Sequence, residues 1–182
     1  MRCGVLKQLA TGGLLVAAMT ACSSSTTTSP GPSPSVTVTI ADTNMAPTLK
    51  SGQVIEVTDM VGGHYTPHRG DVVLFKSPQG WFDPGAGPFI EVERVIGVPG
   101  DHVACPGPGS PVTVNGVILN EPYVYKGDEP SMEPFDVTVP SGRLWVMGDH
   151  RDVSEDSRAH ERMEPGAGFV PMAIVTGLYQ AK

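Results

Sequence analysis

Short runs of alternating or β-branched apolar residues recur along the chain from residue 36 onward, and polar turn sequences separate them. None of the runs keeps the 3.6-residue spacing of an amphipathic helix over several turns. We therefore expect β-strands and few or no long helices. The expected strands are Val36–Ile40, Gln53–Val57, Asp71–Phe75, Phe89–Val98, Leu144–Met147 and Ala173–Leu178.

One further segment, Val112–Leu119, predicts a specific turn. Asn115 and Gly116 lie between its two alternating apolar runs, and this pair supplies the two positive φ angles of a type I′ β-hairpin. The 22 glycines and 18 prolines among the 182 residues also favour short strands and turns over helices. We expect a mainly β fold, a compact antiparallel sandwich or partly open barrel.

The apolar pattern of the first residues is different. Arg2 and Lys7 precede the uncharged run Leu9–Ala21, which is too short to span a bilayer comfortably and suits the core of a secretory signal. The run ends in Met19-Thr20-Ala21-Cys22, which resembles the lipobox of bacterial lipoproteins. That resemblance implies that Cys22 is diacylated, becomes the mature N-terminus and anchors the protein to a membrane.

After Cys22, residues 23–35 contain only Ser, Thr, Pro and Gly, a composition typical of an extended linker. The expected organisation is a lipoprotein signal peptide (1–21), a lipidated cysteine with its linker (22–35) and a β domain (36–182). The alternatives are an ordinary signal peptide that is cleaved elsewhere and a signal-anchor helix.

Charge and cysteine content narrow the classes of partner. The chain has 12 Lys and Arg against 19 Asp and Glu, a net charge of −7, so it lacks the basic excess that a nucleic-acid partner requires. Loss of Cys3 with the signal peptide and acylation of Cys22 leave Cys105 as the only thiol. We therefore expect no intrachain disulfide, and we expect Cys105 in a half-buried loop.

The histidines and one aromatic pair are the remaining candidates for a binding role. The pairs His64/His68 and His150/His160 lack the ligand spacing of a metal site, so we expect surface histidines, no metal and no cofactor. Trp81 and Phe82 lie in a Gly- and Pro-rich loop. They either cover the core or contact lipid or a peptide.

Four segments, in order, resemble the sequence boxes of type I signal peptidases, the serine-lysine enzymes that cut signal peptides from exported proteins. The segments are Asn44-Met45-Ala46-Pro47-Thr48-Leu49, Arg69-Gly70-Asp71-Val72-Val73-Leu74-Phe75, Glu93-Arg94-Val95-Ile96-Gly97-Val98-Pro99-Gly100-Asp101 and Met147-Gly148-Asp149-His150-Arg151-Asp152-Val153-Ser154-Glu155-Asp156-Ser157-Arg158. The resemblance covers residues 36–182 and implies the β fold of that family.

Three positions depart from the family pattern. Asn44 stands where the resemblance places the serine nucleophile, Glu93 where it places the lysine general base, and Asp42 where it places an oxyanion-hole serine. An asparagine has no hydroxyl, a glutamate has no amine, and a carboxylate opposes a developing oxyanion. The Ser-Lys mechanism therefore cannot operate with these residues.

The other matching positions are expected to form a hydrogen-bonded frame around the active centre. Ser154 matches a hydroxyl that orients the lysine in the family, so here we expect it to bond Glu93 or water. Ser154 and Ser157 both lie in the fourth segment, which supports the active centre, so we do not favour them as replacement nucleophiles. The frame residues are Met45, Pro47, Arg94, Asp149, Arg151, Ser154, Asp156 and Arg158.

Three functions follow as hypotheses. The first is a catalytically inactive homologue, anchored through lipid on Cys22 at the outer face of the bacterial cytoplasmic membrane, that binds extended peptides such as signal peptides or exported preproteins, or regulates protein processing. The second is a hydrolase with Glu93 as base and Asn44 as oxyanion donor. The third is a purely structural lipoprotein.

Overall fold

The structure, a computed structural model, describes residues 34–60, 65–85 and 87–181. The predicted signal peptide, Cys22 and most of the predicted linker lie outside the described residues, so their predictions stay predictions. The first strand begins at Ser35, one residue before the predicted domain boundary.

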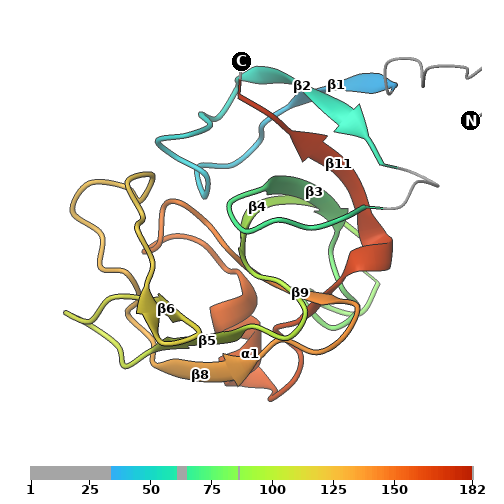
Figure 1. Cartoon of the computed structure of the whole chain (residues 1–182). Coiled ribbons are helices and arrows are strands. Elements are labelled where there is room, and N and C mark those ends of the chain that lie inside the picture. Colours follow the sequence, from blue (N-terminus) through green and yellow to red (C-terminus); the bar gives the residue numbers. More distant parts are fainter. Residues whose placement is uncertain (1–33, 61–64, 86, 182) are drawn as a thin grey trace, which may run out of the picture. The chain divides into compact units, whose positions relative to one another are not determined.

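A seven-stranded sheet forms most of the fold, and all of its neighbouring strands are antiparallel. Its order is β1-β2-β11-β3-β4-β9-β10, and Figure 1 labels these strands except β10. The six strands predicted from apolar runs all lie in this sheet, each shifted by only one or two residues at most ends. The strands are β1 (Ser35–Thr39), β2 (Val54–Asp59), β3 (Val72–Lys76), β4 (Ile90–Gly97), β9 (Arg143–Met147), β10 (Val170–Pro171) and β11 (Val175–Tyr179).

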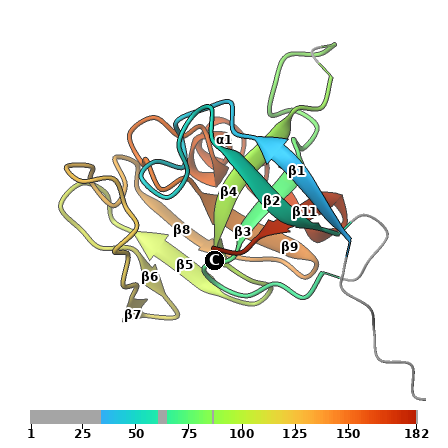
Figure 2. The same cartoon turned by 90° about the horizontal axis from the view of Figure 1, so that it is seen from above.

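A second, four-stranded sheet has the order β7-β6-β5-β8 and is also antiparallel. Figure 2 shows it on one side of the molecule, with β1, β2 and β11 on the other. Its central turn has Asn115 at φ 53° and Gly116 at φ 77°, which confirms the predicted hairpin. The strands are β5 (His102–Cys105), β6 (Thr113–Val114), β7 (Val117–Ile118) and β8 (Phe135–Thr138).

Two antiparallel sheets confirm the predicted mainly β class. The prediction for Cys105 was wrong: this residue ends β5 and is fully buried, because β5 packs its apolar side chains into the core between the sheets. The core near it includes Val103, Phe135 and Trp145.

Helical structure within the described residues is short. The helix α1 (Ser157–Met163) has seven residues, and the 3₁₀ turn η1 (Met172–Ile174) has three. Asp156 caps α1 by accepting a hydrogen bond from the backbone N–H of Arg158. Among the residues that the structure describes, no helix has the length and apolar character needed to cross a membrane.

Candidate active site

The fold brings Asn44 and Glu93 into contact. Glu93 lies in β4, opposite Val73 of β3, and Asn44 lies in the loop that follows β1. The Asn44 carboxamide nitrogen Nδ2 donates one hydrogen bond to Glu93 Oε1 at 3.0 Å and another to the Val92 carbonyl oxygen at 2.8 Å. A carboxamide nitrogen has two N–H groups, and both are used in this arrangement.

The Glu93 carboxyl group is removed from solvent. Its residue is 2% exposed, and Oε1 also accepts a hydrogen bond from Ser154 Oγ at 3.0 Å. Ser154 therefore bonds Glu93, one of the two partners expected from the sequence. The other oxygen, Oε2, is buried and has no hydrogen-bond partner among the described residues.

Burial raises the pKa of Glu93 well above its ordinary value of 4.5. The nearby charge of Asp156 raises this pKa further, while the hydrogen bonds from Asn44 and Ser154 oppose the shift. Glu93 therefore keeps its proton at pH values at which an exposed glutamate has lost it.

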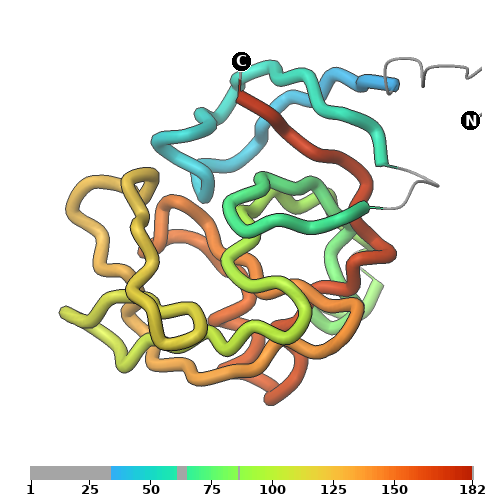
Figure 3. Tube along the Cα trace, viewed as in Figure 1, coloured from blue at the N-terminus to red at the C-terminus, as the bar shows by residue number. Residues whose placement is uncertain are grey.

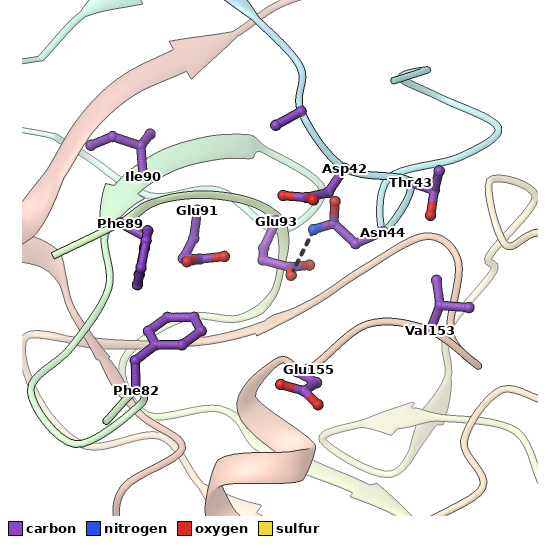
Figure 4. Close-up of a pocket in the computed structure, with 11 residues that line it drawn as sticks. Asp42, Thr43, Asn44, Phe82, Phe89, Ile90, Glu91, Glu93, Val153 and Glu155 are labelled. Carbon is purple, nitrogen blue, oxygen red and sulfur yellow. Dashed lines mark hydrogen bonds between the residues drawn. The ribbon is translucent and has the colours of Figure 1, made fainter. Parts of the chain in front are cut away.

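A pocket of about 600 Å³ opens beside this pair (Figure 4). Four carboxyl groups line it, and no Lys, Arg or His is among the lining residues. The four are Asp42, Glu91, Glu93 and Glu155. Asp42, the residue expected at the oxyanion-hole position, is exposed at this pocket and raises the pKa of Glu91, although burial raises that pKa more.

The opposite wall of the pocket is apolar. Phe82 and Phe89 form it with their rings in an edge-to-face contact, 4.9 Å between centroids. Ile90 lies on the same side, whereas Val153 lines the other end of the pocket, near Thr43 and Asn44, and both are at least half exposed. In the view of Figure 4, the Glu91 and Glu93 carboxyl groups lie between these rings and Asn44.

The loop that carries Trp81 and Phe82 divides its two aromatic residues between the core and the pocket. Trp81 is buried, donates from Nε1 to the Ala167 carbonyl at 2.8 Å and stacks on His160 at 4.0 Å. The prediction of a surface histidine was wrong for His160, which is 3% exposed because it packs under this indole. His68, in contrast, is exposed as predicted.

Arg94 and Asp149 form a buried ion pair next to Glu93. Arg94 Nε donates to Asp149 Oδ1 at 2.7 Å, and Nη2 donates to Oδ2 at 2.6 Å. Thr48 also donates to Asp149, and the Arg94 guanidinium lies 4.0 Å from the centre of the Tyr123 ring. Such a bidentate pair with further partners fixes the orientation of both side chains.

Two more arginines hold the segment after β9. Arg158 is bidentate to Asp156, with Nε to Oδ1 at 2.9 Å and Nη2 to Oδ2 at 2.8 Å. Arg151 donates to the Gly148 carbonyl at 2.9 Å and forms an ion pair with Glu121. All these charged groups have at most one-tenth of their side chains exposed. The expected frame residues of this segment therefore lie together.

The Asn44 loop is tied to the same segment. The backbone N–H of His150 donates to the Asn44 carbonyl at 2.8 Å, so the loop after β1 and the loop after β9 lie side by side (Figure 3). Gly148 allows this approach, because a Cβ atom there would lie 2.4 Å from Ser154 Oγ and 2.7 Å from the Asn44 carbonyl oxygen. On the other side of the loop, Met45 is fully buried, whereas Pro47 is exposed.

Ser154 and Ser157, the two serines of the fourth segment, have different surroundings in the structure. Ser157 Oγ is fully buried and accepts a hydrogen bond from the Val146 backbone N–H at 2.9 Å, a structural role. Ser154 donates to Glu93 but does not line the pocket of about 600 Å³ described above, which we call the acidic pocket. Ser154 lines a smaller pocket together with Arg158. Within the described part of the chain, no group of three or more His, Cys, Asp or Glu side chains is arranged to hold a metal ion.

Sequence reasoning missed several residues of the site. Glu91 is two positions before Glu93 on β4, and side chains two apart in a strand share a face, so this one was within reach of the strand prediction. Phe89 is the first residue of the predicted strand Phe89–Val98 and lies two positions before Glu91, so the same spacing pointed to it, whereas Glu155 carried no comparable signal. Tyr123 lies under Arg94 only because a long loop returns from the small sheet to the Arg94–Asp149 pair.

Comparison with known proteins gives consistent similarities. The chain matches the family described as signal peptidase, peptidase S26, over residues 14–182. It is 34% identical over 180 residues to "Signal peptidase I" of Mycobacterium tuberculosis, with 76% of this chain and 61% of the relative covered. It is also 34% identical over 126 residues to "Signal peptidase I U" of Bacillus subtilis, with 65% of this chain and 63% of the relative covered.

Among solved structures, a signal peptidase I from Enterococcus faecalis is 30% identical in sequence, with a TM-score of 0.48 and with 64% of this chain and 98% of that chain covered. The present chain spans about three fifths of the length of the mycobacterial and Bacillus relatives.

Proposed function

This chain belongs to the signal peptidase family, peptidase S26, and we propose that it is a member that binds extended peptides without cutting them. The observation that carries the proposal is the 3.0 Å hydrogen bond from the Asn44 carboxamide to the Glu93 carboxyl group. Serine-lysine chemistry needs a hydroxyl and a neutral amine at such a pair. An amide and a carboxylic acid supply neither of them.

The first half of β4 offers an edge to which a peptide can add, and on this segment the Val92 carbonyl already accepts a hydrogen bond from Asn44 Nδ2. Residues 90–93 pair with β3 on one side, whereas the pairing with β9 on the other side begins only at Arg94. A second groove of about 210 Å³ runs between residues 38–42 and residues 90–92. An extended peptide binds at such an edge through main-chain hydrogen bonds, and side-chain pockets give specificity.

Two measurements on the purified full chain test the proposal. A preprotein that an active signal peptidase cuts under the same conditions should stay intact, and a capped extended peptide should bind to the chain in a calorimetric titration. Cleavage that disappears in Glu93→Gln would overturn the inactive assignment, and absence of peptide binding would overturn the binding role.

The second candidate is a hydrolase that uses Glu93 as general base. The raised pKa of Glu93 and its position on a pocket favour it. The Asn44 amide opposes it, because both of its N–H groups already bond the Val92 carbonyl and Glu93, so none is left for an oxyanion. A peptide-hydrolysis rate that rises with pH and falls in Asn44→Ala would support this candidate.

The location of the protein is part of the proposal. We propose anchoring through lipid on Cys22, which places the domain at the outer face of the bacterial cytoplasmic membrane, where exported preproteins emerge. Metabolic incorporation of a labelled fatty acid should occur in the natural chain and be lost in Cys22→Ala, with Cys105→Ala as the matched control that keeps the label. A third candidate, a purely structural lipoprotein, would keep the label and bind no peptide.

A further inference from the structure

The pocket beside Asn44 and Glu93 is lined by acids on one side and by aromatic rings on the other. We propose that it receives the basic side chain of a bound peptide, a lysine or an arginine. This inference rests on the peptide binding proposed above and specifies the class of peptide.

The first support is the unpaired oxygen of Glu93. The residue is 2% exposed and lines the pocket, and Oε1 accepts hydrogen bonds from Asn44 and Ser154. Oε2 has no partner among the described residues. A buried polar atom without a partner costs free energy, and a ligand that brings an N–H donor to Oε2 removes that cost.

The second support is the sign of the charge around Glu93. Asp42, Glu91 and Glu155 line the same pocket, and no basic residue lines it with them. Like charges at short distance repel each other, which disfavours an anionic ligand. A cationic group offsets the repulsion and favours the ionised form of Glu93.

The third support is the apolar wall. Lysine and arginine carry aliphatic stems that pack on apolar surface while the charged end finds polar partners. Phe82, Phe89 and Ile90 supply such a surface opposite the acids. The faces of the two phenylalanine rings also attract a cation.

The neighbouring groove points to a peptide as the source of the basic group. The acidic pocket and the groove along residues 38–42 and 90–92 share Asp42, Asn44 and Glu91. A peptide main chain along the β4 edge would therefore carry a side chain into the acidic pocket. A metal ion is disfavoured, because the described acids form no group that could hold one.

A pair of capped peptides tests the inference on the purified full chain. Both have alternating alanine and valine residues; one has a central lysine, and its twin has the uncharged norleucine of similar length there. We expect the lysine peptide to bind about five times more tightly than the norleucine peptide at low salt, because a partly exposed ion pair contributes about 1 kcal/mol. Raising the salt concentration to about 1 M should shrink this advantage.

Variants of Asp42, which is exposed, and of Glu91, which is half-buried, locate the effect while the buried Glu93 stays unchanged. Glu91→Gln and Asp42→Asn should each reduce the preference for lysine over norleucine, whereas Glu164→Gln, an exposed acid that does not line the pocket, should leave it unchanged. Thermal unfolding of each variant shows whether it is folded. A preference that persists in Glu91→Gln combined with Asp42→Asn overturns the assignment to this pocket.

The outcomes separate this inference from the function on which it rests. Equal binding of the two peptides overturns the basic side-chain assignment and leaves peptide binding in place. Binding of neither peptide overturns peptide binding itself. Butylamine that binds as tightly as the lysine peptide overturns the peptide as the source and identifies a site for free amines.

Discussion

Asn44 donates a 3.0 Å hydrogen bond to Glu93, and this contact determines what both side chains can do. It uses one N–H of the Asn44 amide, while the Val92 carbonyl takes the other. It also occupies Glu93 Oε1 together with Ser154, so that only Oε2 is left for a ligand. Asn44 is therefore a positioning residue for Glu93, and Oε2 is the one Glu93 oxygen without a hydrogen-bond partner among the described residues.

The raised pKa of Glu93 predicts how stability depends on pH. In the unfolded chain Glu93 ionises near 4.5, whereas the folded protein keeps its proton to higher pH. The unfolded state then binds fewer protons, so the free energy of unfolding falls as pH rises from about 4.5 to the raised pKa, by up to ~1.4 kcal/mol per pH unit.

Glu93→Gln tests this dependence, because glutamine keeps an oxygen that accepts from Asn44 and Ser154 but cannot ionise. Urea unfolding across the pH range should show the variant gaining stability relative to the natural chain as pH rises above about 4.5. Glu164→Gln is the control, since this acid is exposed, and its curve should parallel that of the natural chain. If the free energies of unfolding of Glu93→Gln and of the natural chain differ by the same amount at every pH, the raised pKa of Glu93 is contradicted.

Gly148 predicts a steric effect on the same site. Alanine there would bring Cβ to 2.4 Å from Ser154 Oγ and force the loops of Asn44 and Ser154 apart. We expect Gly148→Ala to lower the free energy of unfolding by about 1–3 kcal/mol, the usual cost of overpacking. Gly177→Ala is the control, because its nearest neighbour, Val57 Cγ2, is 3.3 Å from the new atom and the effect should be smaller. Equal losses in the two variants would argue against the close approach.

The Arg94–Asp149 pair predicts a large loss of folding stability when one partner is removed, and a smaller one than the sum when both are removed. Removing one partner leaves a buried charge without compensation, so Arg94→Met should cost about 3–5 kcal/mol. Adding Asp149→Leu removes that charge, and the double variant should lose less than the sum of the single losses. Arg162→Met is the control, because its pair with Glu133 is largely exposed on the arginine side and should change stability by less than about 1 kcal/mol. Additive losses at Arg94 and Asp149 would contradict direct pairing.

The strands show what the sequence could and could not predict about the fold. The runs that became β3, β4 and β9 have many apolar residues because these strands lie inside the large sheet. The strands β5 and β8 have four residues each and combine polar with apolar side chains, so no pattern of sufficient length distinguished them from loops. The helix α1 has only seven residues, fewer than a periodic pattern needs.

The site shows a similar division. The sequence segments that match the family in order were sufficient to identify Asn44, Glu93 and the residues of the ion pairs. Such segments keep their residue spacing as long as the fold is kept. Phe82 and Phe89 enter the pocket from the connection between β3 and β4, and Glu155 enters it from the segment between β9 and α1, so their contacts arise only when the chain has folded. The burial of His160 likewise depends on Trp81, which lies 79 positions earlier and reaches it through tertiary packing.

His160 predicts a second pH dependence, with the opposite sign. Burial lowers its pKa from the ordinary value of 6.5, and its Nε2 atom has no partner among the described residues. As pH falls below about 6.5 the unfolded chain takes up the proton more readily than the folded protein, so stability falls. His160→Gln should lessen this acid sensitivity, measured by tryptophan fluorescence during urea unfolding at several pH values. His68→Gln, at an exposed histidine, is the control and should keep the full sensitivity.

The acidic pocket predicts that reverting the two central positions alone will not restore cleavage. In the double variant Asn44→Ser with Glu93→Lys, the carboxylates of Asp42, Glu91 and Glu155 would face the introduced amine and stabilise its charged form, which cannot act as a base. We expect no cleavage of a preprotein near pH 7 until Asp42→Ser and Glu91→Gln are added, with activity then rising toward alkaline pH as the amine loses its proton. The same four substitutions with Asn44→Ala in place of Asn44→Ser provide the matched control, which should stay inactive at every pH. Full cleavage by the double variant at pH 7 would show that the surrounding acids do not control the charge at this position.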